Sequence, residues 1–530
     1  MSKNITRRDA IKLGAVATTI GTVAACAAPA VSIADEAAPE FGIPSTEIFD
    51  DPAFTLPAPG PIAFEADPIP DDQIVREEEA EVLILGCGVA GICAAASCAE
   101  NGLAPVVLEK GESFAFRGGE ICAWGDRAHV EAGLTATTPN ELVKALADLS
   151  EWRGDYGLFK KWSVNCNEAV DWFDDAVSEA AGPMYVSWKN GNADMVNTRW
   201  YGTAVQWPNG WNAALQAMID KATADGATFI YNSPAVQLVT EDGAVAGAIA
   251  KTEEGYIKYK AGNVILATGS YDRNPERMKK YMRPRDMAAS IWMNFTATDT
   301  GDGHEMGLAV GAVEDEYPHT LMTASTRHIG LLRVNSCGQR FTPEYLSATL
   351  LLNAIQNQLG GYCWIIADAN GLTALENTAG DYSMGGPEAQ WATIQQMGVS
   401  ADTLEGLAEQ MGVPADAFVK TINRYNELCE KGVDDDFDCP AFCLNAIAEP
   451  PFYAYRENVI MLLSVSGLRV TTDFEVISKE THSPIPGLYA IGNVMGGMFI
   501  GSYAHNVSGV SHSRCITFGK MLGEYLAAKK

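Results

Sequence analysis

The clearest pattern along the chain is a short apolar run that leads into a glycine-rich turn and then into an alanine-rich stretch. Residues 82–85 carry only Val, Leu and Ile side chains, which is typical of a strand buried on both faces of a parallel sheet. We expect a helix to follow as far as about Asn101, and a second buried strand over residues 105–108. This order of strand, helix and strand predicts the first unit of an α/β fold.

Glycines stand at the first, third and sixth positions of the turn over residues 86–91. Gly86 permits the tight turn, Gly88 lets a pyrophosphate approach the backbone, and Gly91 lets the helix pack closely on the strand. The start of the helix offers free N–H groups to phosphates. Glu109 follows the second strand, where its carboxylate can accept hydrogen bonds from a ribose. The segment therefore predicts a dinucleotide site.

Further glycine turns decide between FAD and NAD. A second turn over residues 117–120, soon after Glu109, is the arrangement with which flavoproteins surround the pyrophosphate and the flavin. Two later strands end in turns at Gly269 and Gly492, and a helix opening at about Gly509 would direct its N–H groups at the pyrimidine end of a flavin. Four turns that close on one cofactor favour FAD. The residues expected to bind it are Gly86, Gly88, Val89, Ala90, Gly91, Glu109, Lys110, Gly118, Gly119, Glu120, Val236, Ala267, Thr268, Gly269, Asp302, Gly492, Asn493, Gly509 and Val510.

Composition narrows the class of protein. With 530 residues the chain is too long for one compact core, so two or more domains are expected. Its formal net charge of −30 at pH 7 argues against nucleic acid as a partner, because a phosphate backbone requires clustered Lys and Arg. The 12 cysteines include no Cys-x-x-Cys motif, so we expect no zinc, iron–sulfur or attached haem site. Cys87, Cys93 and Cys98 are expected to be small core side chains.

The first residues have the form of an export signal. Arg7 and Arg8 precede a weakly apolar run, which is typical of the twin-arginine signal that carries folded proteins across a membrane. Cys26 is a candidate site of lipoprotein acylation, and cleavage a few residues later would instead release a soluble protein. We interpret residues 1–34 as a signal peptide and residues 35–77, rich in Pro, Ala and acid, as a linker or surface-wrapping arm. The expected location is the periplasm or the outer face of the membrane.

These motifs, in this order, resemble the fumarate reductase/succinate dehydrogenase flavoprotein superfamily, which includes 3-ketosteroid dehydrogenases and urocanate reductase. The resemblance implies an α/β fold with a Rossmann-like FAD-binding domain over residues 78–314 and 457–530. It further implies that an α+β capping domain over residues 315–456 interrupts this domain. A cap suits hydride transfer, because closure excludes water and fixes the substrate against N5 of the flavin. The segments that carry the resemblance are 86–91, 267–269, 301–303, 338–341 and 486–519.

Fumarate reductases bind the two carboxylates of their substrate with arginines and histidines. The resemblance indicates which residues stand at those positions here. Aligning the family's Arg-Phe-x-x-Glu stretch on residues 340–344 places Ala348 where the proton-donating arginine is expected. Leu463 stands near the expected histidine, and residues 503–506 replace the second arginine. These changes argue against fumarate as the substrate.

The altered segment resembles the ketosteroid dehydrogenase branch, in which a tyrosine beside the flavin handles a proton. Tyr503 is the corresponding residue, and a phenol can donate a hydrogen bond to an enone oxygen or a proton to a carbanion. The alternative is a tyrosine that only packs on the flavin edge. Glu344 and Tyr345 are weaker catalytic candidates, placed by adjacency to the displaced arginine. His505 is a candidate proton relay, because its unperturbed pKa lies near neutrality.

The leading hypothesis is an exported FAD-dependent oxidoreductase acting on CH–CH groups. It would reduce an activated C=C bond, in an enone or an enoate, by hydride transfer from flavin N5, while Tyr503 protonates the α-carbon. The missing carboxylate clamp and the tryptophans between Trp124 and Trp211 favour a hydrophobic or aromatic small molecule, although clustered tryptophans are more often core residues.

The partners expected are a separate cytochrome or membrane quinol as the electron donor, because neither a haem nor an NAD site is evident, and the Tat translocase during export. Two alternatives stay open. One is a 3-ketosteroid-type dehydrogenase that runs the reverse desaturation, and the other is a non-catalytic flavin electron shuttle.

Overall fold

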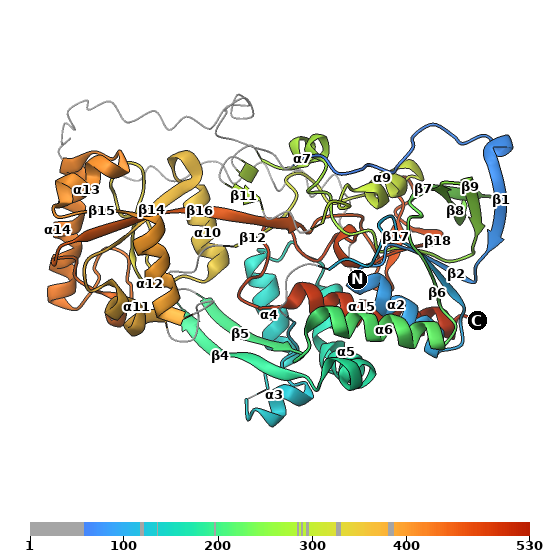
Figure 1. Ribbon diagram of the computed structural model, residues 1–530, viewed down its shortest axis with the longest axis horizontal. Helices are drawn as coiled ribbons and strands as arrows, with labels where there is room; N and C mark the ends of the chain where they lie inside the picture. Colours follow the sequence, from blue (N-terminus) through green and yellow to red (C-terminus); the bar gives the residue numbers. More distant parts are fainter. Residues whose placement is uncertain are drawn as a thin grey trace, which may run out of the picture. The chain divides into compact units, whose positions relative to one another are not determined.

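A six-stranded sheet brings together strands from both ends of the chain (Figure 1). The computed structural model describes residues 58–116, 121–134, 136–195, 198–283, 286–287, 290–292, 296–324, 330–379 and 386–530. In spatial order the strands are β17 (Glu475–Ile477), β18 (Pro484–Ala490), β10 (Val264–Leu266), β2 (Val82–Leu85), β3 (Pro105–Leu108) and β6 (Thr228–Ile230). All neighbours run parallel except β17 and β18. The predicted α/β fold is confirmed, since β2 and β3 are the two strands expected from the apolar runs.

Long helices pack on this sheet and on one another. α2 (Val89–Glu100) follows β2, and α15 (Val510–Ala528) lies along it, while α5 (Tyr156–Ala181) and α6 (Gly210–Ala224) complete the layer. Two glycines of α15 set the closeness of the central helix pair. A Cβ on Gly519 would lie 2.8 Å from Cβ of Cys93, and one on Gly523 would lie 2.6 Å from Cβ of Ser97. Small residues on both helices therefore let their backbones approach.

The core around these helices contains the cysteines that were expected there and several tryptophans whose role the sequence left open. Cys87, Cys93 and Cys98 are fully buried, as expected for small apolar side chains. Four tryptophans also belong to this core, which confirms the core interpretation for Trp124, Trp162, Trp207 and Trp211.

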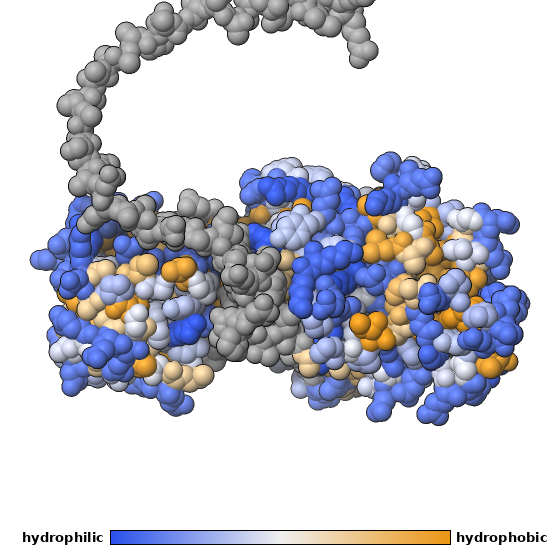
Figure 2. Space-filling model, turned by 90° about the horizontal axis from the view of Figure 1, so that it is seen from above, coloured by the Kyte–Doolittle hydropathy of each residue, from blue (hydrophilic) through white to orange (hydrophobic). Residues whose placement is uncertain are grey.

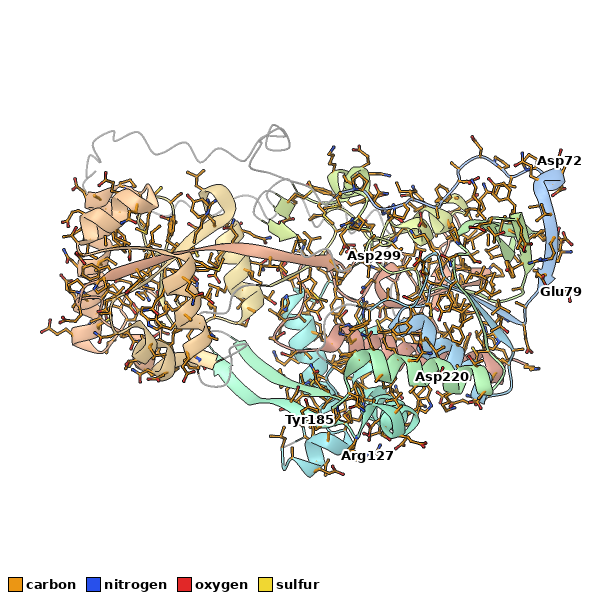
Figure 3. The ribbon with its side chains drawn as sticks, in the orientation of Figure 1. Asp72, Glu79, Arg127, Tyr185, Asp220 and Asp299 are labelled. Carbon is orange, nitrogen blue, oxygen red and sulfur yellow. The ribbon has the colours of Figure 1, made fainter. Side chains whose placement is uncertain are left out.

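A second sheet of four strands, in the order β1 (Ile74–Glu79), β9 (Gly255–Lys260), β8 (Ala244–Thr252) and β7 (Ala235–Glu241), is preceded by an arm. The short helix η2 (Asp71–Gln73) leads into β1, and Asp72 and Glu79 are labelled at the two ends of this segment in Figure 3. Upstream, the N–H of Gly60 donates to the carbonyl of Arg273 at 2.8 Å. The described part of the segment expected to be a linker or arm thus lies on other elements, and its last residues form a strand.

The third sheet consists mostly of strands from the predicted cap, residues 315–456. Its main path is β11 (Ser290–Trp292), β16 (Phe452–Ser464), β14 (Tyr362–Ala367) and β13 (Leu332–Val334), and β12 (Leu321–Ala324) and β15 (Val399–Ala401) also pair with β16. The helices in this part of the chain are α10 (Ala348–Gln356), α11 (Gly371–Ala379), α12 (Gly386–Met397), α13 (Leu404–Met411) and α14 (Ala415–Lys431). β16 continues without a break past residue 456, where the cap was expected to end; the domain bounds themselves stay a prediction.

The remaining elements connect these sheets. They are α3 (Arg127–Glu131), α4 (Pro139–Leu149), β4 (Tyr185–Met195), β5 (Thr198–Gln206), α7 (Pro275–Tyr281), α9 (Asp302–Ala309), η3 (Leu359–Gly361), η5 (Ala441–Cys443) and η6 (Gly492–Val494). By their contacts, the described residues from 58 to 530 belong to one unit. Figure 2 shows a face on which hydrophilic residues predominate, with apolar patches between them. Within the described ranges, no helix combines the length and the apolar character that crossing a membrane requires.

A buried ion pair joins two strands of the third sheet. Arg333 on β13 donates from Nε to Oε2 of Glu457 on β16 at 2.9 Å, and neither side chain is exposed. Cys363 on β14, the strand between them, directs its thiol at the same carboxylate oxygen at 3.8 Å. Removing two charges from water costs several kcal/mol per ion, so each partner depends on the other for compensation.

We expect Glu457→Gln or Arg333→Met to destabilise the protein by about 3–5 kcal/mol, because each variant removes the opposite charge from a buried ion pair. The double variant Arg333→Met/Glu457→Leu should recover most of this loss. Urea unfolding followed by circular dichroism measures the effect. The matched control is Arg76→Met, which removes an exposed pair with Glu254 and should cost below about 1 kcal/mol. Equal losses in the single and double variants would contradict the expectation.

Candidate active site

The turn between β2 and α2 is closed by glycine. Gly86 has a φ of +108°, and its N–H donates to the carbonyl of Leu108 at the end of β3. A Cβ on Gly91 would lie 2.1 Å from the carbonyl oxygen of Gly86, so no side chain fits there. Among the described atoms, a Cβ on Gly88 would meet only the carbonyl oxygen of Ala115, at 3.6 Å. Gly88 therefore borders space that the described residues do not fill.

Glu109 lies beside this turn. Its Oε2 accepts the N–H of Cys87 at 2.8 Å, its Oε1 accepts the N–H of Gly111 at 2.7 Å, and the residue is 8% exposed. Each carboxylate oxygen has a second lone pair for a further donor. The acid predicted from the sequence thus stands at the mouth of the glycine turn, oriented by backbone N–H groups.

Lys110 and Asp302 bind each other. Lys110 Nζ lies 2.6 Å from Oδ2 of Asp302 and 2.7 Å from Oγ1 of Thr300. The other carboxylate oxygen of Asp302 accepts the N–H groups of Ala63 and Phe64 from the N-terminal arm. Their predicted role in binding FAD stays a prediction, and their visible role is to attach the arm.

The turn after β10 packs directly on the first glycine turn. A Cβ on Gly86 would lie 2.5 Å from the carbonyl oxygen of Ala267, so these two backbones are in contact. Gly269 has a φ of +77°, and Asp299, labelled in Figure 3, accepts the N–H of Ser270 at 3.3 Å. Oγ1 of Thr268 is buried and has no hydrogen-bond partner in the described part of the chain.

The turn after β18 and the start of α15 complete the arrangement. Gly492 has a φ of +74°, and a Cβ on it would lie 3.1 Å from Cβ of Ala90 in α2. Gly509 precedes α15 with a φ of +71°, and Val510 is the first helical residue. Asn493 accepts a hydrogen bond from Arg514 through Oδ1 at 2.7 Å.

Of the other predicted cofactor residues, three are described and three are not. Val89 and Ala90 form the first turn of α2, beside Gly88. Val236 lies in β7 and accepts the N–H of Glu65 through its carbonyl. Gly118, Gly119 and Glu120 lie outside the described residues, as do Arg7, Arg8 and Cys26.

These residues fit a dinucleotide that carries a flavin. The N-caps of both α2 and α15 are glycines without a side-chain cap, so no N-cap side chain covers the N–H groups at the start of either helix. The free space at Gly88 suits a pyrophosphate at the first helix, and Glu109 suits a ribose. The site thus has the donors, the acceptor and the space that the sequence predicted.

A cavity lies beside the loop that carries Tyr503. Tyr503 is 5% exposed, and its ring meets the ring of His505 edge to face, with 4.7 Å between centroids. Helix α10 holds the loop in place. Thr349 Oγ1 donates to the carbonyl of Tyr503 at 2.7 Å and accepts the N–H of His505 at 3.0 Å, and Asn353 donates to Oγ of Ser502 at 3.2 Å. Tyr503 and His505, both predicted catalytic residues, therefore line one cavity.

Sequence patterns did not single out Arg283 and His319, which also line this cavity. Arg283 donates from Nε and Nη2 to both carboxylate oxygens of Asp286, at 2.6 and 2.8 Å. His319 bonds through Nδ1 with the hydroxyl of Tyr271 at 2.8 Å and through Nε2 with the carbonyl of Asp315 at 2.9 Å. Burial lowers the pKa of His319 to about 4, so its ring is neutral at pH 7. Neither residue stands in a spacing motif, so only folding reveals them.

Glu344 and Tyr345 do not line this cavity. Glu344 is fully buried and accepts from Arg340 through both oxygens, at 2.8 and 2.5 Å. Arg340 also binds both carboxylate oxygens of Asp434, and these pairings raise the pKa of its guanidinium further above its ordinary value although burial opposes them. Tyr345 packs edge to face on Phe442. Their predicted catalytic roles stay untested, and their contacts connect parts of the predicted cap.

Two alanine substitutions separate the roles of the glycines. We expect Gly91→Ala to lower the unfolding temperature, because its methyl group would collide with the carbonyl of Gly86. Gly88→Ala should leave that temperature within about 2 °C in the FAD-free protein, since a Cβ meets no atom closer than 3.6 Å there. It should nevertheless weaken FAD binding at least about tenfold, because the methyl group occupies the approach of the pyrophosphate. Thermal melts and flavin titration measure both, and a Gly88→Ala protein with normal affinity would refute the assignment.

Several curated proteins are similar over most of this chain. A vinyl phenol reductase from Lactiplantibacillus plantarum is 27% identical over 508 residues, covering 86% of this chain and 97% of the relative. A fumarate reductase (cytochrome) from Shewanella frigidimarina is 26% identical over 466 residues, covering 84% and 77%. A digoxin reductase from Eggerthella lenta is 25% identical over 594 residues, covering 100% and 98%.

Solved structures confirm the fold. A 3-ketosteroid-Δ4-(5α)-dehydrogenase from Rhodococcus jostii matches with a TM-score of 0.71 and 22% identity, over 87% of this chain and 99% of that one. The open conformation of a flavocytochrome c3 fumarate reductase matches with a TM-score of 0.63 and 23% identity, over 87% and 81%. At these identities the likeness concerns the fold alone.

The family is decided by a match that includes all the glycine turns described above. Residues 81–510 match the FAD binding domain family, which is more than half of the chain. The cofactor is therefore FAD, as the sequence predicted. The chain belongs to the FAD binding domain family.

Proposed function

We propose that this protein reduces an activated C=C bond, in an enone or an enoate, of a hydrophobic or aromatic small molecule. The observation that carries the proposal is the cavity in which Tyr503 and His505 are held by Thr349 of α10.

Three residues of the cavity have a part in this reaction. Reduced FAD, when bound, supplies the hydride for the β-carbon of the substrate. Tyr503 donates its phenolic proton to the α-carbon, and its oxygen becomes a phenolate. His505 stands beside the phenol ring, where it relays a proton from solvent to restore the hydroxyl. Thr349 fixes the backbone of both residues and so keeps the donor oriented.

The charges that line the cavity support a neutral substrate over a dicarboxylate. Arg283 is the cation among the described residues that line this cavity, and its ion pair with Asp286 carries no net charge. His319 is neutral at pH 7 and is held by Tyr271 and Asp315. Surroundings with so little net charge suit a neutral substrate better than a dicarboxylate.

The names of the similar proteins support the direction of reaction. The vinyl phenol reductase and the digoxin reductase are both named for reductions, and the similarity to this chain extends over nearly the whole length of each. We therefore propose reduction in preference to the reverse desaturation or a flavin shuttle.

We further propose that the protein works outside the cytoplasm and receives electrons from a separate cytochrome or membrane quinol. Residues 1–34 support export through their paired arginines, with Cys26 as a possible point of lipid attachment. One relative is named a fumarate reductase (cytochrome), which supports a haem protein as the donor class.

A substrate panel tests the proposed reaction. The FAD-loaded protein, reduced by a viologen dye under anaerobic conditions, should be reoxidised by at least one member of a panel of enones, cinnamates, vinyl phenols, urocanate and 3-ketosteroids, and faster than by fumarate. Tyr503→Phe should lower this rate about 10²- to 10⁴-fold, as expected for loss of a general acid, without loss of FAD. The matched control is Tyr156→Phe, at an exposed tyrosine, which should keep the rate. A Tyr503→Phe protein with undiminished turnover would refute the proposed role of Tyr503. A reduced flavin that no member of the panel reoxidises would refute the proposed reaction and favour the electron shuttle.

A further inference from the structure

Arg514, in the second turn of α15, is completely buried although it carries a permanent charge. Its Nη2 donates to Asn493, and its guanidinium carbon lies 4.8 Å from the centroid of the Phe499 ring. Nε and Nη1 have no hydrogen-bond partner within the described part of the chain. Buried donors without partners are rare in folded proteins, so a cation with two of them needs an explanation.

The charge of Arg514 is not neutralised by an ion pair with any described residue. Asp315 is the carboxylate that acts on it through space, but that carboxylate is already shared. It accepts the N–H of Gly497 at 3.0 Å and of Gly467 at 3.3 Å, and it lies 3.4 Å from Nη1 of Arg469. Burial raises the pKa of Asp315 to about 6 and lowers the pKa of Arg514. The surroundings of Arg514 therefore keep an excess of positive charge.

Phe499 connects Arg514 with Tyr503, the proposed proton donor. The ring centroids of Phe499 and Tyr503 are 4.9 Å apart, so the guanidinium and the phenol ring both contact the ring of Phe499. Tyr503 is itself among the through-space influences on the charge of Arg514. The charged and titratable groups that face these two residues are His505, Arg283, Asp286, His319, Asp315, Arg469 and Cys515.

We propose that Arg514 is a positioning residue for proton transfer by Tyr503, in that its buried positive charge stabilises the phenolate left when Tyr503 donates its proton. The inference rests on the proposed function, in which Tyr503 is the proton donor. In that step the O–H bond of Tyr503 breaks, a C–H bond forms at the α-carbon, and the negative charge passes from the substrate to the phenol oxygen. A fixed opposite charge in a medium of low dielectric constant favours this charged form.

The pH dependence of turnover tests the inference. Activity that needs a protonated phenol is lost as the pH rises through the pKa of that phenol. Because Arg514 favours the phenolate, Arg514→Gln should raise this pKa, move the high-pH limb upward by about one pH unit and lower kcat at pH 7 about tenfold. Arg514→Lys keeps a positive charge and should leave the limb within about 0.3 unit.

Two variants of the neighbouring charges serve as controls. Arg469→Gln removes a cation whose side chain is 35% exposed, and solvent screening should limit its effect to less than half that of Arg514→Gln. Asp315→Asn removes the opposing negative charge while Arg514 stays, so it should move the limb to lower pH. This second variant gives an answer even if Arg514→Gln does not fold.

The outcomes separate this inference from the proposed function. If Tyr503→Phe loses turnover while neither Arg514→Gln nor Asp315→Asn moves the limb, Arg514 has only a structural role and the inference is wrong. Equal shifts in Arg469→Gln and Arg514→Gln also overturn it. If Tyr503→Phe keeps both its turnover and its high-pH limb, the proposed function fails, and the role of Arg514 fails with it. Limb shifts of opposite sign in Arg514→Gln and Asp315→Asn, in an enzyme that needs Tyr503, support it.

Discussion

The backbone after β2 lies in direct contact with the backbone after β10, and glycine sets the distance between them. A Cβ on Gly86 would lie 2.5 Å from the carbonyl oxygen of Ala267, and one on Gly91 would lie 2.1 Å from that of Gly86. These contacts fix where α2 begins relative to the ends of three parallel strands. Glu109 and the turn at Gly492 then meet the same helix start from either side, and the cofactor site follows from this one close approach.

Local signals were sufficient to predict this half of the molecule. The apolar runs of β2 and β3 are buried on both faces, and the glycine spacing of residues 86–91 requires a defined backbone, so neighbouring residues alone fix the structure. Glu109 was predictable for the same reason, because it follows its strand directly. By contrast, the contact between Lys110 and Asp302 joins residues far apart in sequence, and no local pattern announces that the two side chains bind each other.

The substrate side could be predicted only in part. Tyr503 was found through a resemblance and His505 through the near-neutral pKa of an imidazole, and both residues line one cavity. Arg283, His319 and Thr349 come from a loop after α7, a segment before β12 and the start of α10, so their meeting depends on the third sheet and its connections. Glu344 lies near Thr349 in sequence, yet its pairing with Arg340 holds it elsewhere. Adjacency along the chain was therefore a poor guide to adjacency in the cavity.

β16 has a consequence for how such proteins can be recombined. This strand of 13 residues pairs with β14 and β15 near its start and with β11 and β12 near its end, and the N–H of Ser464 then meets Asp272 at 3.4 Å. Residues assigned to the predicted cap and to the predicted cofactor domain thus pair along the same strand. A chimaera that exchanges the predicted cap must therefore place its C-terminal junction beyond Ser464 and bring β11 and β12 with it.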